Sequence, residues 1–589
     1  MSDSSGVLTG RRQLLALTAA ATLDGALGAV LGRNTIVATG ADAAERGKLP
    51  IGMNLSGIAD WEPGFPFLNL LWGAREWLTR NASGEGPYNT ELVMHLELDE
   101  NGYPYEIPFK PVSAEYPQQV FTLLPNVLKA GKFVILYDGA GEIGATGATK
   151  IIKSQPGRIE IFMQHNRDLT EGIVIRKSMR GNHVRNIRIL PIDDEKADLE
   201  ANPFRREVIE FCKPWHCLRF MDWQATNASI NQRWAARKTR SFYTQTGVNG
   251  DIGGMYGTAL PAWQKKWSSG VAVELCLQLA NLTKTDAWLC VPHLADDNYI
   301  IEMAKLVKAK LDPSLKVYLE FSNEIWNWSF IQSQWMLRSE VAGDLVVNAG
   351  GQAPWKARTK PSRFVNGIVA DGAGEGIDHP ERIGALIRRC FGLWEEVFSG
   401  NDRIRLIRVC AVQATWTDTV QRTLNWVVKN GGCDALSPAG YFGPDDTVYA
   451  KWETAGAKLT KSDVIADMKP MVTSYGKYLG INLAIAKKAG VKLVVYEGGQ
   501  HIQPLNQALT PYTMALGEAQ TDPAMYELYR DNLNQYAKDG CGVFCAYSSV
   551  GQQGSRWGSW GHAEYYGQPP VEAPKYRALL EANTAKGRL

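Results

Sequence analysis

The sequence has almost no excess charge and, beyond its N-terminal region, no long apolar run. Its 589 residues carry 63 Lys and Arg against 61 Asp and Glu, a formal net charge of +2. This balance does not support a nucleic-acid groove or adhesion to an anionic membrane. Beyond the N-terminal region, no stretch of about 20 residues is apolar enough to span a bilayer. We therefore expect no nucleic-acid partner and no stable membrane insertion.

Cysteine and metal-ligand patterns are also missing. The nine cysteines are an odd number without zinc-finger spacing, which fits neither a disulfide framework nor a structural metal site. Several lie inside apolar runs such as AWLCV and GVFCAY, as small buried hydrophobes do. His293 with Asp296 and Asp297 is a ligand cluster on paper, but the aspartates fit better as a helix start. We expect no metal and no cofactor, and no G-x-S-x-G elbow indicates a serine nucleophile.

Aromatic residues are abundant. The chain contains 19 Trp, 22 Tyr and 17 Phe. A generous core would explain them. Sugar binding would explain them equally well, because a flat indole face matches the apolar face of a pyranose ring.

The N-terminus resembles a twin-arginine export signal. Arg11 and Arg12 precede an Ala/Leu-rich apolar run, and Ala41–Asp42–Ala43 supplies an A-x-A cleavage site. Asp24 interrupts the run, which counts against a permanent anchor. We expect residues 1–43 to be a signal peptide and the mature protein to be secreted or periplasmic.

Apolar strand-like runs alternate with amphipathic helical runs after the signal. We expect strands at 50–58, 216–223, 287–295, 316–324, 405–414, 433–443, 491–501 and 542–550. Eight strands, mostly separated by helices, predict an α/β fold of the parallel (β/α)8 TIM-barrel kind. A doubly wound open sheet is the alternative, but no glycine-rich dinucleotide turn follows the first strand.

Two segments interrupt the repeat. Residues 81–195 contain short alternating apolar runs separated by turn residues, which predicts an inserted all-β, sandwich-like domain between strands one and two. Residues 44–80 would then supply the first barrel strand and the segment after it, and 196–589 the remainder of the barrel. The Gly/Ala-rich stretch 333–378 predicts a long loop or small lid on the active face.

Two glutamates stand where barrel enzymes place their chemistry, at the C-terminal ends of strands. Glu324 ends the fourth predicted strand and Glu497 lies in the seventh. Such a pair can hold carboxyls on both sides of a glycosidic bond, about 5–5.5 Å apart for double displacement with retention. The plainer alternatives are a helix N-terminal charge for Glu324 and a turn residue for Glu497. Further candidates for substrate contact near the strand ends are Asn54, Arg219, Asp222, His293, Asn323, Trp326, Trp328, Tyr441, Trp557 and Trp560.

At these residues the sequence resembles a clan A glycoside hydrolase, the barrel superfamily that includes the family 5 cellulases and mannanases. The resemblance is carried by SNE at 322–324 and YEGG at 496–499, together with His293, Arg219 and Tyr441. The stretches WLCVPHLADD and VYLEFSNEIWNW also resemble a subgroup of secreted bacterial proteins loosely described as cellulose-binding.

The resemblance implies that Glu324 is the general acid/base and Glu497 the nucleophile. The acid must hold its proton in the resting site, and the nucleophile must stay ionised. Arg219 and Tyr441 would stabilise the Glu497 carboxylate. Asn323 would bind the sugar 2-hydroxyl, where contacts tighten in the transition state.

Several of these residues have a plainer explanation. His293 would contact the sugar or orient the glutamate pair, but it also fits a hydrogen-bonded core histidine. Arg219 fits an ion pair with Asp222 or Asp60, and Tyr441 fits core packing. Glu320, within the fourth strand, is not expected to be catalytic. Trp326 and Trp328 would lie against a sugar chain, although at least one of them fits the core.

Taken together, these features predict a secreted retaining glycoside hydrolase that cleaves a β-linked polysaccharide or oligosaccharide with two glutamates. The alternatives are a non-catalytic carbohydrate-binding or matrix protein on the same barrel, and a transglycosylase that shares the covalent intermediate. The sugar, the linkage and the choice between endo and exo action stay open.

Overall fold

The computed structural model describes seven stretches of the chain: residues 48–126, 129–164, 170–247, 266–338, 364–365, 368–369 and 379–584. The predicted signal peptide, 1–43, lies outside them, as does most of the loop predicted for 333–378.

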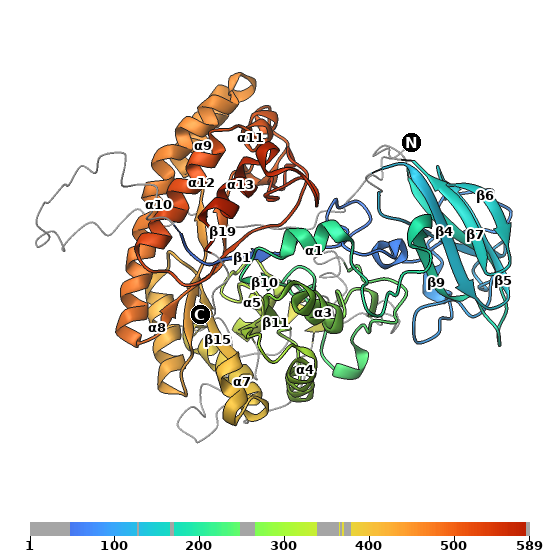
Figure 1. Cartoon of the computed structure of the whole chain (residues 1–589), viewed down its shortest axis with the longest axis horizontal. Coiled ribbons are helices and arrows are strands. Elements are labelled where there is room, and N and C mark those ends of the chain that lie inside the picture. The colour runs from blue at the N-terminus through green and yellow to red at the C-terminus, as the bar shows by residue number, and fades with distance from the viewer. Residues whose placement is uncertain are drawn as a thin grey trace, which may run out of the picture.

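The larger part of the chain is a curled parallel sheet with helices around it (Figure 1). Each of the eight predicted stretches contains at least one of its strands, and the sixth and seventh stretches contain two each. The strands are β1 (Ile51–Asn54), β10 (Cys217–Arg219), β11 (Asp286–Val291), β12 (Val317–Phe321), β15 (Leu406–Val412), β16 (Ala435–Pro438), β17 (Gly440–Phe442), β18 (Lys492–Leu493), β19 (Val495–Gln500) and β20 (Phe544–Ala546).

The strands at the two ends of this sheet come from the same two stretches of chain, the sixth and the seventh predicted strands. The order is β17-β19-β20-β1-β10-β11-β12-β15-β16-β18, and every pairing is parallel. Only Ala439 separates β16 from β17, and only Val494 separates β18 from β19. The first strand of each stretch, β16 or β18, therefore lies at one end of the order, and the second, β17 or β19, lies at the other end. The sheet is barrel-like, and the predicted α/β class is confirmed.

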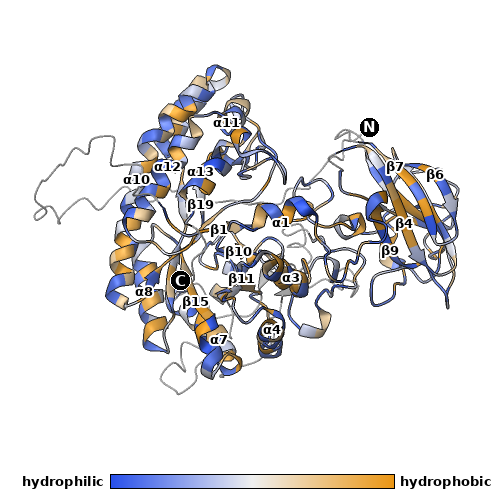
Figure 2. Ribbon diagram, in the orientation of Figure 1, coloured by the Kyte–Doolittle hydropathy of each residue, from blue (hydrophilic) through white to orange (hydrophobic). Residues whose placement is uncertain are grey.

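One helix begins where its sequence signal predicts. Asp296 caps the helix after β11, because its side chain accepts a hydrogen bond from the amide of Tyr299. Apolar and polar residues alternate along the helices beside the sheet, as expected for helices with one buried face (Figure 2). No helix among the described residues is both long enough and apolar enough to cross a membrane. The helices are α1 (Arg206–Cys212), α3 (Val273–Thr283), α4 (Asp297–Lys310), α5 (Ile331–Arg338), α7 (His379–Val397), α8 (Thr417–Lys429), α9 (Asp446–Ala455), α10 (Lys461–Ala489), α11 (Thr513–Ala519), α12 (Met525–Lys538) and α13 (Pro574–Ala582).

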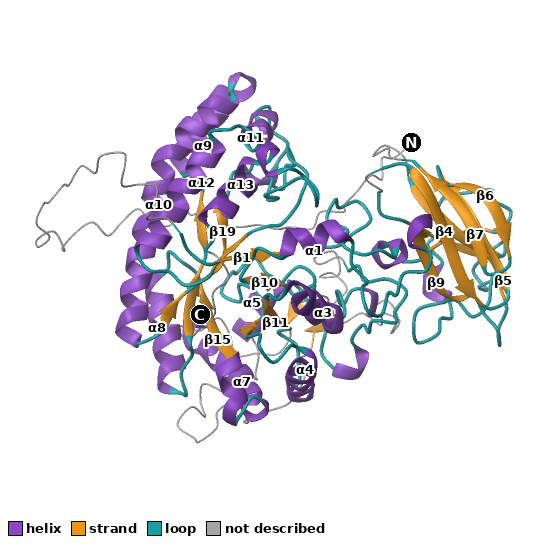
Figure 3. Cartoon of the chain, in the orientation of Figure 1, coloured by secondary structure: helices purple, strands orange, loops and turns teal. Residues whose placement is uncertain are grey.

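Between β1 and β10 the chain forms two antiparallel four-stranded sheets, ordered β2-β3-β8-β5 and β6-β7-β4-β9. They lie to one side of the helix-covered sheet (Figure 3). β2 begins at Leu78, slightly before the predicted boundary at 81. That this region is a separate inserted domain stays a prediction. Its strands are β2 (Leu78–Asn81), β3 (Gln118–Leu123), β4 (Gly131–Asp138), β5 (Gly141–Gly147), β6 (Lys150–Gln155), β7 (Arg158–Met163), β8 (Glu171–Ser178) and β9 (Arg185–Pro191); a short pair, β13 (Phe364–Val365) and β14 (Ile368–Val369), lies elsewhere.

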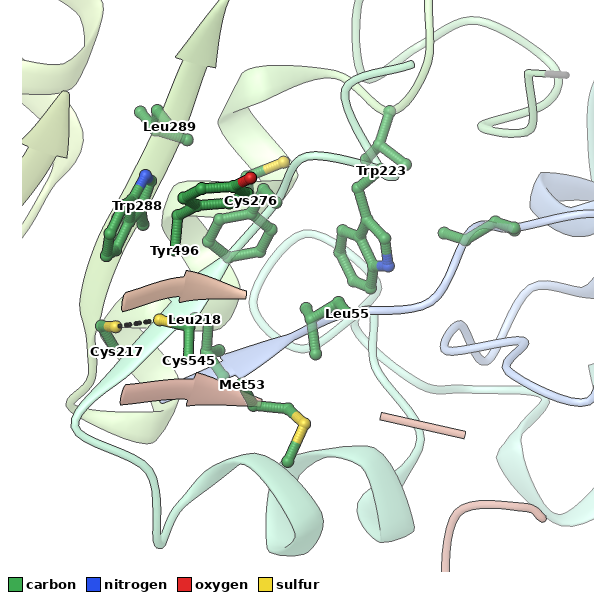
Figure 4. Close-up of a cluster of buried hydrophobic side chains, with 14 of the residues drawn as sticks. Met53, Leu55, Cys217, Leu218, Trp223, Cys276, Trp288, Leu289, Tyr496 and Cys545 are labelled. Atoms are coloured by element: carbon green, nitrogen blue, oxygen red, sulfur yellow. Dashed lines mark hydrogen bonds between the residues drawn. The ribbon is translucent and has the colours of Figure 1, made fainter. Parts of the chain in front are cut away.

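Close packing inside the curled sheet explains one glycine of β1 and two cysteines (Figure 4). Cys217 and Cys545, on the strands flanking β1, bring their sulfur atoms to 3.3 Å. A Cβ at Gly52 would lie 2.5 Å from both sulfurs, so glycine is the residue that fits between them. All nine cysteines are buried, as expected for small hydrophobes.

Candidate active site

Glu324 and Glu497 come together at the C-terminal end of the parallel sheet. Glu324 follows β12 and Glu497 lies in β19, and both side chains are almost fully buried. The two carboxyls lie near enough for the charge of Glu324 to raise the pKa of Glu497. Two residues from distant parts of the chain thus form one carboxyl pair.

The backbone after β12 turns sharply to present Glu324. Ser322 has φ of 59° and Glu324 has φ of 42°, a left-handed conformation that non-glycine residues seldom adopt. The side chain of Asn327 donates to Oε2 of Glu324 at 2.9 Å, and the hydroxyl of Tyr496 donates to Oε1 at 3.0 Å. These bonds hold the strained turn and fix the direction of the carboxyl.

Arg219, the last residue of β10, organises the site beneath the pair. Its side chain is completely buried. Its Nη1 donates to Oδ1 of Asn54 at 2.9 Å and to Oε2 of Glu497 at 3.2 Å. Its Nη2 donates to Oδ1 of Asn323 at 2.8 Å. The structure therefore brings Asn54, Arg219, Asn323 and Glu497 into one hydrogen-bonded group.

The main ion-pair partner of Arg219 is Glu320, which sequence reasoning set aside. Nε and Nη2 of Arg219 donate to the two carboxyl oxygens of Glu320, each at 2.9 Å. The suggested alternatives, Asp222 and Asp60, are wrong as partners. Asp60 pairs with Arg75 at 3.0 Å, and Asp222 accepts a hydrogen bond from Tyr547 at 3.2 Å. Sequence spacing was a usable signal for Glu320. Side chains of a regular strand alternate between its two faces, so Glu320, which lies an even number of positions before Glu324, would share its face.

The environment raises the proton affinity of both glutamates. Burial raises the pKa of Glu324, although hydrogen bonds from Asn327 and Tyr496 oppose this shift. Burial and the charge of Glu324 raise the pKa of Glu497 well above its ordinary value, and Arg219 lowers it only in part. The raised pKa of Glu324 agrees with the expectation for an acid. The raised pKa of Glu497 corrects the expectation of an independently ionised carboxylate, since two buried carboxyls in contact share a proton.

Tyr441 does not play the part that was expected of it. Burial and the nearby charge of Glu497 raise its pKa well above the usual range. Within the described chain it makes no hydrogen bond to Glu497, and Tyr496 supplies the phenol contact to the pair instead, at Glu324. Tyr441 packs edge-on against His501, Tyr547 and Trp560, with ring centroids 5.4–6.5 Å apart.

Trp557 and Trp560 lie on the loop after β20. The indole of Trp560 donates to the carbonyl of Trp557 at 2.8 Å, and its ring contacts Tyr547. The guanidinium of Arg556 lies 4.2 Å from the ring centre of Trp557. Trp560 thus belongs to the aromatic group beside the pair, and Trp557 lies next to it in the loop.

His293 makes no hydrogen bond to the glutamate pair. Its ring is buried edge-on against Trp335, with centroids 5.5 Å apart. Neither ring nitrogen has a hydrogen-bond partner among the described residues. Burial lowers the pKa of His293 to about 3, so the ring is neutral. In the described structure His293 makes no hydrogen bond to either glutamate, and its role toward a sugar stays a prediction.

The two tryptophans after Glu324 have different environments. Trp326 is 8% exposed and belongs to the core, whereas Trp328 is 46% exposed. Trp328 meets Trp416, which is 39% exposed, with ring centroids 5.9 Å apart and an interplanar angle of 74°. Trp416 follows β15 and was not singled out in the sequence, because a lone exposed indole has no local signature.

The described part of the chain contains no set of side chains arranged to bind a metal ion. No group of three or more His, Cys, Asp or Glu residues is arranged there to hold an ion.

Comparison with known proteins gives only distant structural likenesses. No protein-family model and no curated protein matches the chain. Three similar structures are the GH51 arabinofuranosidase from Xanthomonas axonopodis pv. citri (12% identity, TM-score 0.36), a GH5-4 broad specificity endoglucanase from Clostridium acetobutylicum (12%, 0.31) and the endo-1,4-beta-D-mannanase from Thermotoga petrophila RKU-1 (11%, 0.28). The superpositions cover 60%, 64% and 64% of this chain, and 62%, 90% and 93% of the others. The matched part thus spans less than two thirds of the arabinofuranosidase. At these TM-scores the likeness assigns neither a family nor an activity to the chain.

Proposed function

We propose that the chain is a retaining glycoside hydrolase on a (β/α)8 barrel, acting on a β-linked polysaccharide or oligosaccharide. The observation that carries this proposal is the buried pair Glu324–Glu497, with Tyr496 of β19 donating to Glu324 and Arg219 of β10 donating to Glu497. Double displacement requires the two carboxyls about 5–5.5 Å apart, whereas an inverting pair is held about 6.5–9.5 Å apart to admit a water.

In the first step Glu497 attacks the anomeric carbon while the bond to the leaving oxygen breaks. Glu324 donates the shared proton to that oxygen, so the leaving group departs neutral and Glu497 is esterified. The negative charge then lies on Glu324, where Tyr496 and Asn327 donate hydrogen bonds to it. In the second step Glu324 takes a proton from water, the hydroxyl attacks the anomeric carbon, and Glu497 is released.

The assignment of roles follows the donors around each carboxyl. Arg219 contacts Glu497, and a cation favours the carboxylate that must attack as an anion. Glu324 receives hydrogen bonds from two neutral groups, Tyr496 and Asn327. The assignment of roles therefore rests on which carboxyl the arginine contacts.

Aromatic side chains beside the pair support a sugar as the substrate. Trp328, four residues after Glu324 in the chain, and Trp416 expose their indoles next to each other, and Trp560 packs on Tyr441, which lies near Glu497. Asn323 and Asn54 are held by Arg219 next to Glu497, and in this structure their amide nitrogens donate to Asn227 and to the carbonyls of Tyr496 and Ala546. Stacking faces and amide groups are what sugar rings and their hydroxyls require.

Two further parts of the proposal concern the remainder of the chain. Residues 1–43 would direct export, so that the enzyme acts outside the cytoplasm. The antiparallel sheets of 81–195 would form an inserted sandwich-like domain beside the barrel, with alternating buried residues such as those of β7 as its inner face.

A polysaccharide screen with linkage analysis of the products tests the proposal. Wild type should release reducing sugar with retained configuration, and Glu497→Ala should abolish turnover, because no ester can form. Glu324→Ala should act on substrates with good leaving groups, and azide should accelerate it by replacing the water that the base activates. Glu395→Gln, in an ion pair with Arg388 that contacts neither glutamate, is the control. Full activity in both alanine variants, or binding without turnover in wild type, would overturn it; longer products would indicate a transglycosylase.

A further inference from the structure

Glu320 is a buried carboxylate for which the mechanism above has no step. It lies on β12, 1% exposed, beside Cys290 of the neighbouring strand β11. Its Oε1 accepts from Nη2 of Arg219, and its Oε2 accepts from Nε of Arg219 and, at 2.7 Å, from Nε1 of Trp288. Three strong donors on one carboxylate fix its position.

The hydrogen bonds that Arg219 donates are distributed unequally among the groups around it. A guanidinium has five N–H donors, and each takes part in a hydrogen bond here. Two go to Glu320 in the bidentate geometry that binds carboxylates best. The single bond to Glu497 is 3.2 Å, the longest of the five. Glu320 therefore receives most of the arginine's stabilising effect.

We propose that Glu320 is a positioning residue: by holding Arg219 bidentately, it limits the share of the arginine charge that reaches Glu497. If Arg219 turned its bidentate face to Glu497, that carboxylate would be fully compensated and the pair would release its proton at lower pH. With Glu320 in place, Glu324 and Glu497 keep one proton between them. This inference rests on the proposed function, because an acid catalyst is what needs that proton.

Other titratable groups also face the pair and set the background against which Glu320 acts. They come from β10 and the turn after it, from β11, and from β17, β19 and β20: Arg219, Asp222, Cys290, Tyr441, Tyr496 and Tyr547. None of them except Arg219 is a cation, so the arginine is the group through which Glu320 acts on the pair.

Infrared titration of the carboxyl pair in the full-length protein tests the inference without requiring a substrate. The band of the protonated carboxyl is assigned by its loss in Glu324→Gln and Glu497→Gln. In Glu320→Gln the titration should move down by about one pH unit, a roughly tenfold weaker hold on the proton. Glu320→Asp keeps the charge but shortens the side chain, and should move it in the same direction by less, because the bidentate contact is lost.

Glu395→Gln is the matched control, since it breaks another arginine–carboxylate pair and should leave the titration unchanged. An unchanged titration in Glu320→Asp would overturn the positioning role, and this variant decides the question even if Glu320→Gln does not fold. Where activity is found, the alkaline limb of its pH profile should shift with the band. Failure of wild type to hydrolyse any glycoside would overturn the proposed function, whereas the titration would still decide the role of Glu320.

Discussion

The hydroxyl of Tyr496 donates a 3.0 Å hydrogen bond to Oε1 of Glu324. Tyr496 immediately precedes Glu497 in β19, so one strand segment both holds the proposed acid and carries the proposed nucleophile. Any shift of β19 would move both groups of the pair together. This arrangement makes Tyr496 the residue whose loss should separate the two steps of the reaction.

Tyr496→Phe should slow the second step more than the first. The phenol stabilises ionised Glu324, so its loss should raise the pKa of Glu324 and reduce the fraction of active base. A hydrogen bond to a charged group contributes about 1.5–3 kcal/mol, which corresponds to roughly a tenfold or larger loss of deglycosylation rate. Burst kinetics with an aryl glycoside measure the two steps separately. Tyr529→Phe, which removes a phenol from the amide of Gln500, is the control; equal slowing of both steps in Tyr496→Phe would contradict the prediction.

His293 should make the protein sensitive to acid. Its pKa is lowered from 6.5 to about 3 in the folded state because the ring is buried. The unfolded chain binds this proton more readily, so stability is full above about pH 6.5 and falls toward pH 3, by about 1.4 kcal/mol per unit. His293→Leu should flatten this part of the unfolding curve, measured by urea denaturation across pH. His95→Leu, at an exposed histidine, should leave the slope unchanged; an unchanged slope in His293→Leu would show that other groups cause the loss.

Trp328 and Trp416 should contribute to binding of longer substrates. Both indoles are exposed next to each other, and Trp328 follows Glu324 by four residues in the chain. Trp416→Ala should weaken binding roughly three- to tenfold for hexaoses of β-1,4-linked glucose, mannose or xylose, and less for shorter chains. Calorimetry on the inactive Glu497→Gln background measures this. Tyr116→Ala, at an equally exposed aromatic residue of the antiparallel region, should have no effect; equal affinities in both variants would count against the site.

Gly52→Ala should destabilise the fold. Its new methyl would lie 2.5 Å from the sulfurs of Cys217 and Cys545, so strands of the curled sheet would have to move apart. Overpacking of this kind costs about 1–3 kcal/mol, measured by chemical denaturation. Cys217→Ala in the same chain should recover part of the loss by making room. Gly480→Ala is the control for glycine replacement, since nothing lies within 4 Å there and its backbone is not left-handed; a loss equal to that of Gly52→Ala would count against overpacking as the cause.

Local sequence patterns were enough to predict the strand-forming stretches and the ends of several helices. Runs of apolar residues, the Asp296 cap and the placement of Glu324 after an apolar strand all depend on residues close in sequence. The antiparallel strands between β1 and β10 were visible for the same reason, since alternation repeats every two residues.

Only the tertiary structure decided which residues of the site form hydrogen bonds and ion pairs with one another. The bidentate pair of Arg219 with Glu320, the phenol of Tyr496 on Glu324 and the proton shared with Glu497 all join residues from different strands. No local pattern encodes which of several nearby acids an arginine will face. Trp326 and Trp328 are only two residues apart, yet the side chain of Trp326 is buried and that of Trp328 is exposed, which the tertiary structure alone decided. The sequence by itself determined which groups stand at the strand ends; the curvature of the sheet decided their contacts, because burial and the geometry across strands set the partners and proton affinity of each group.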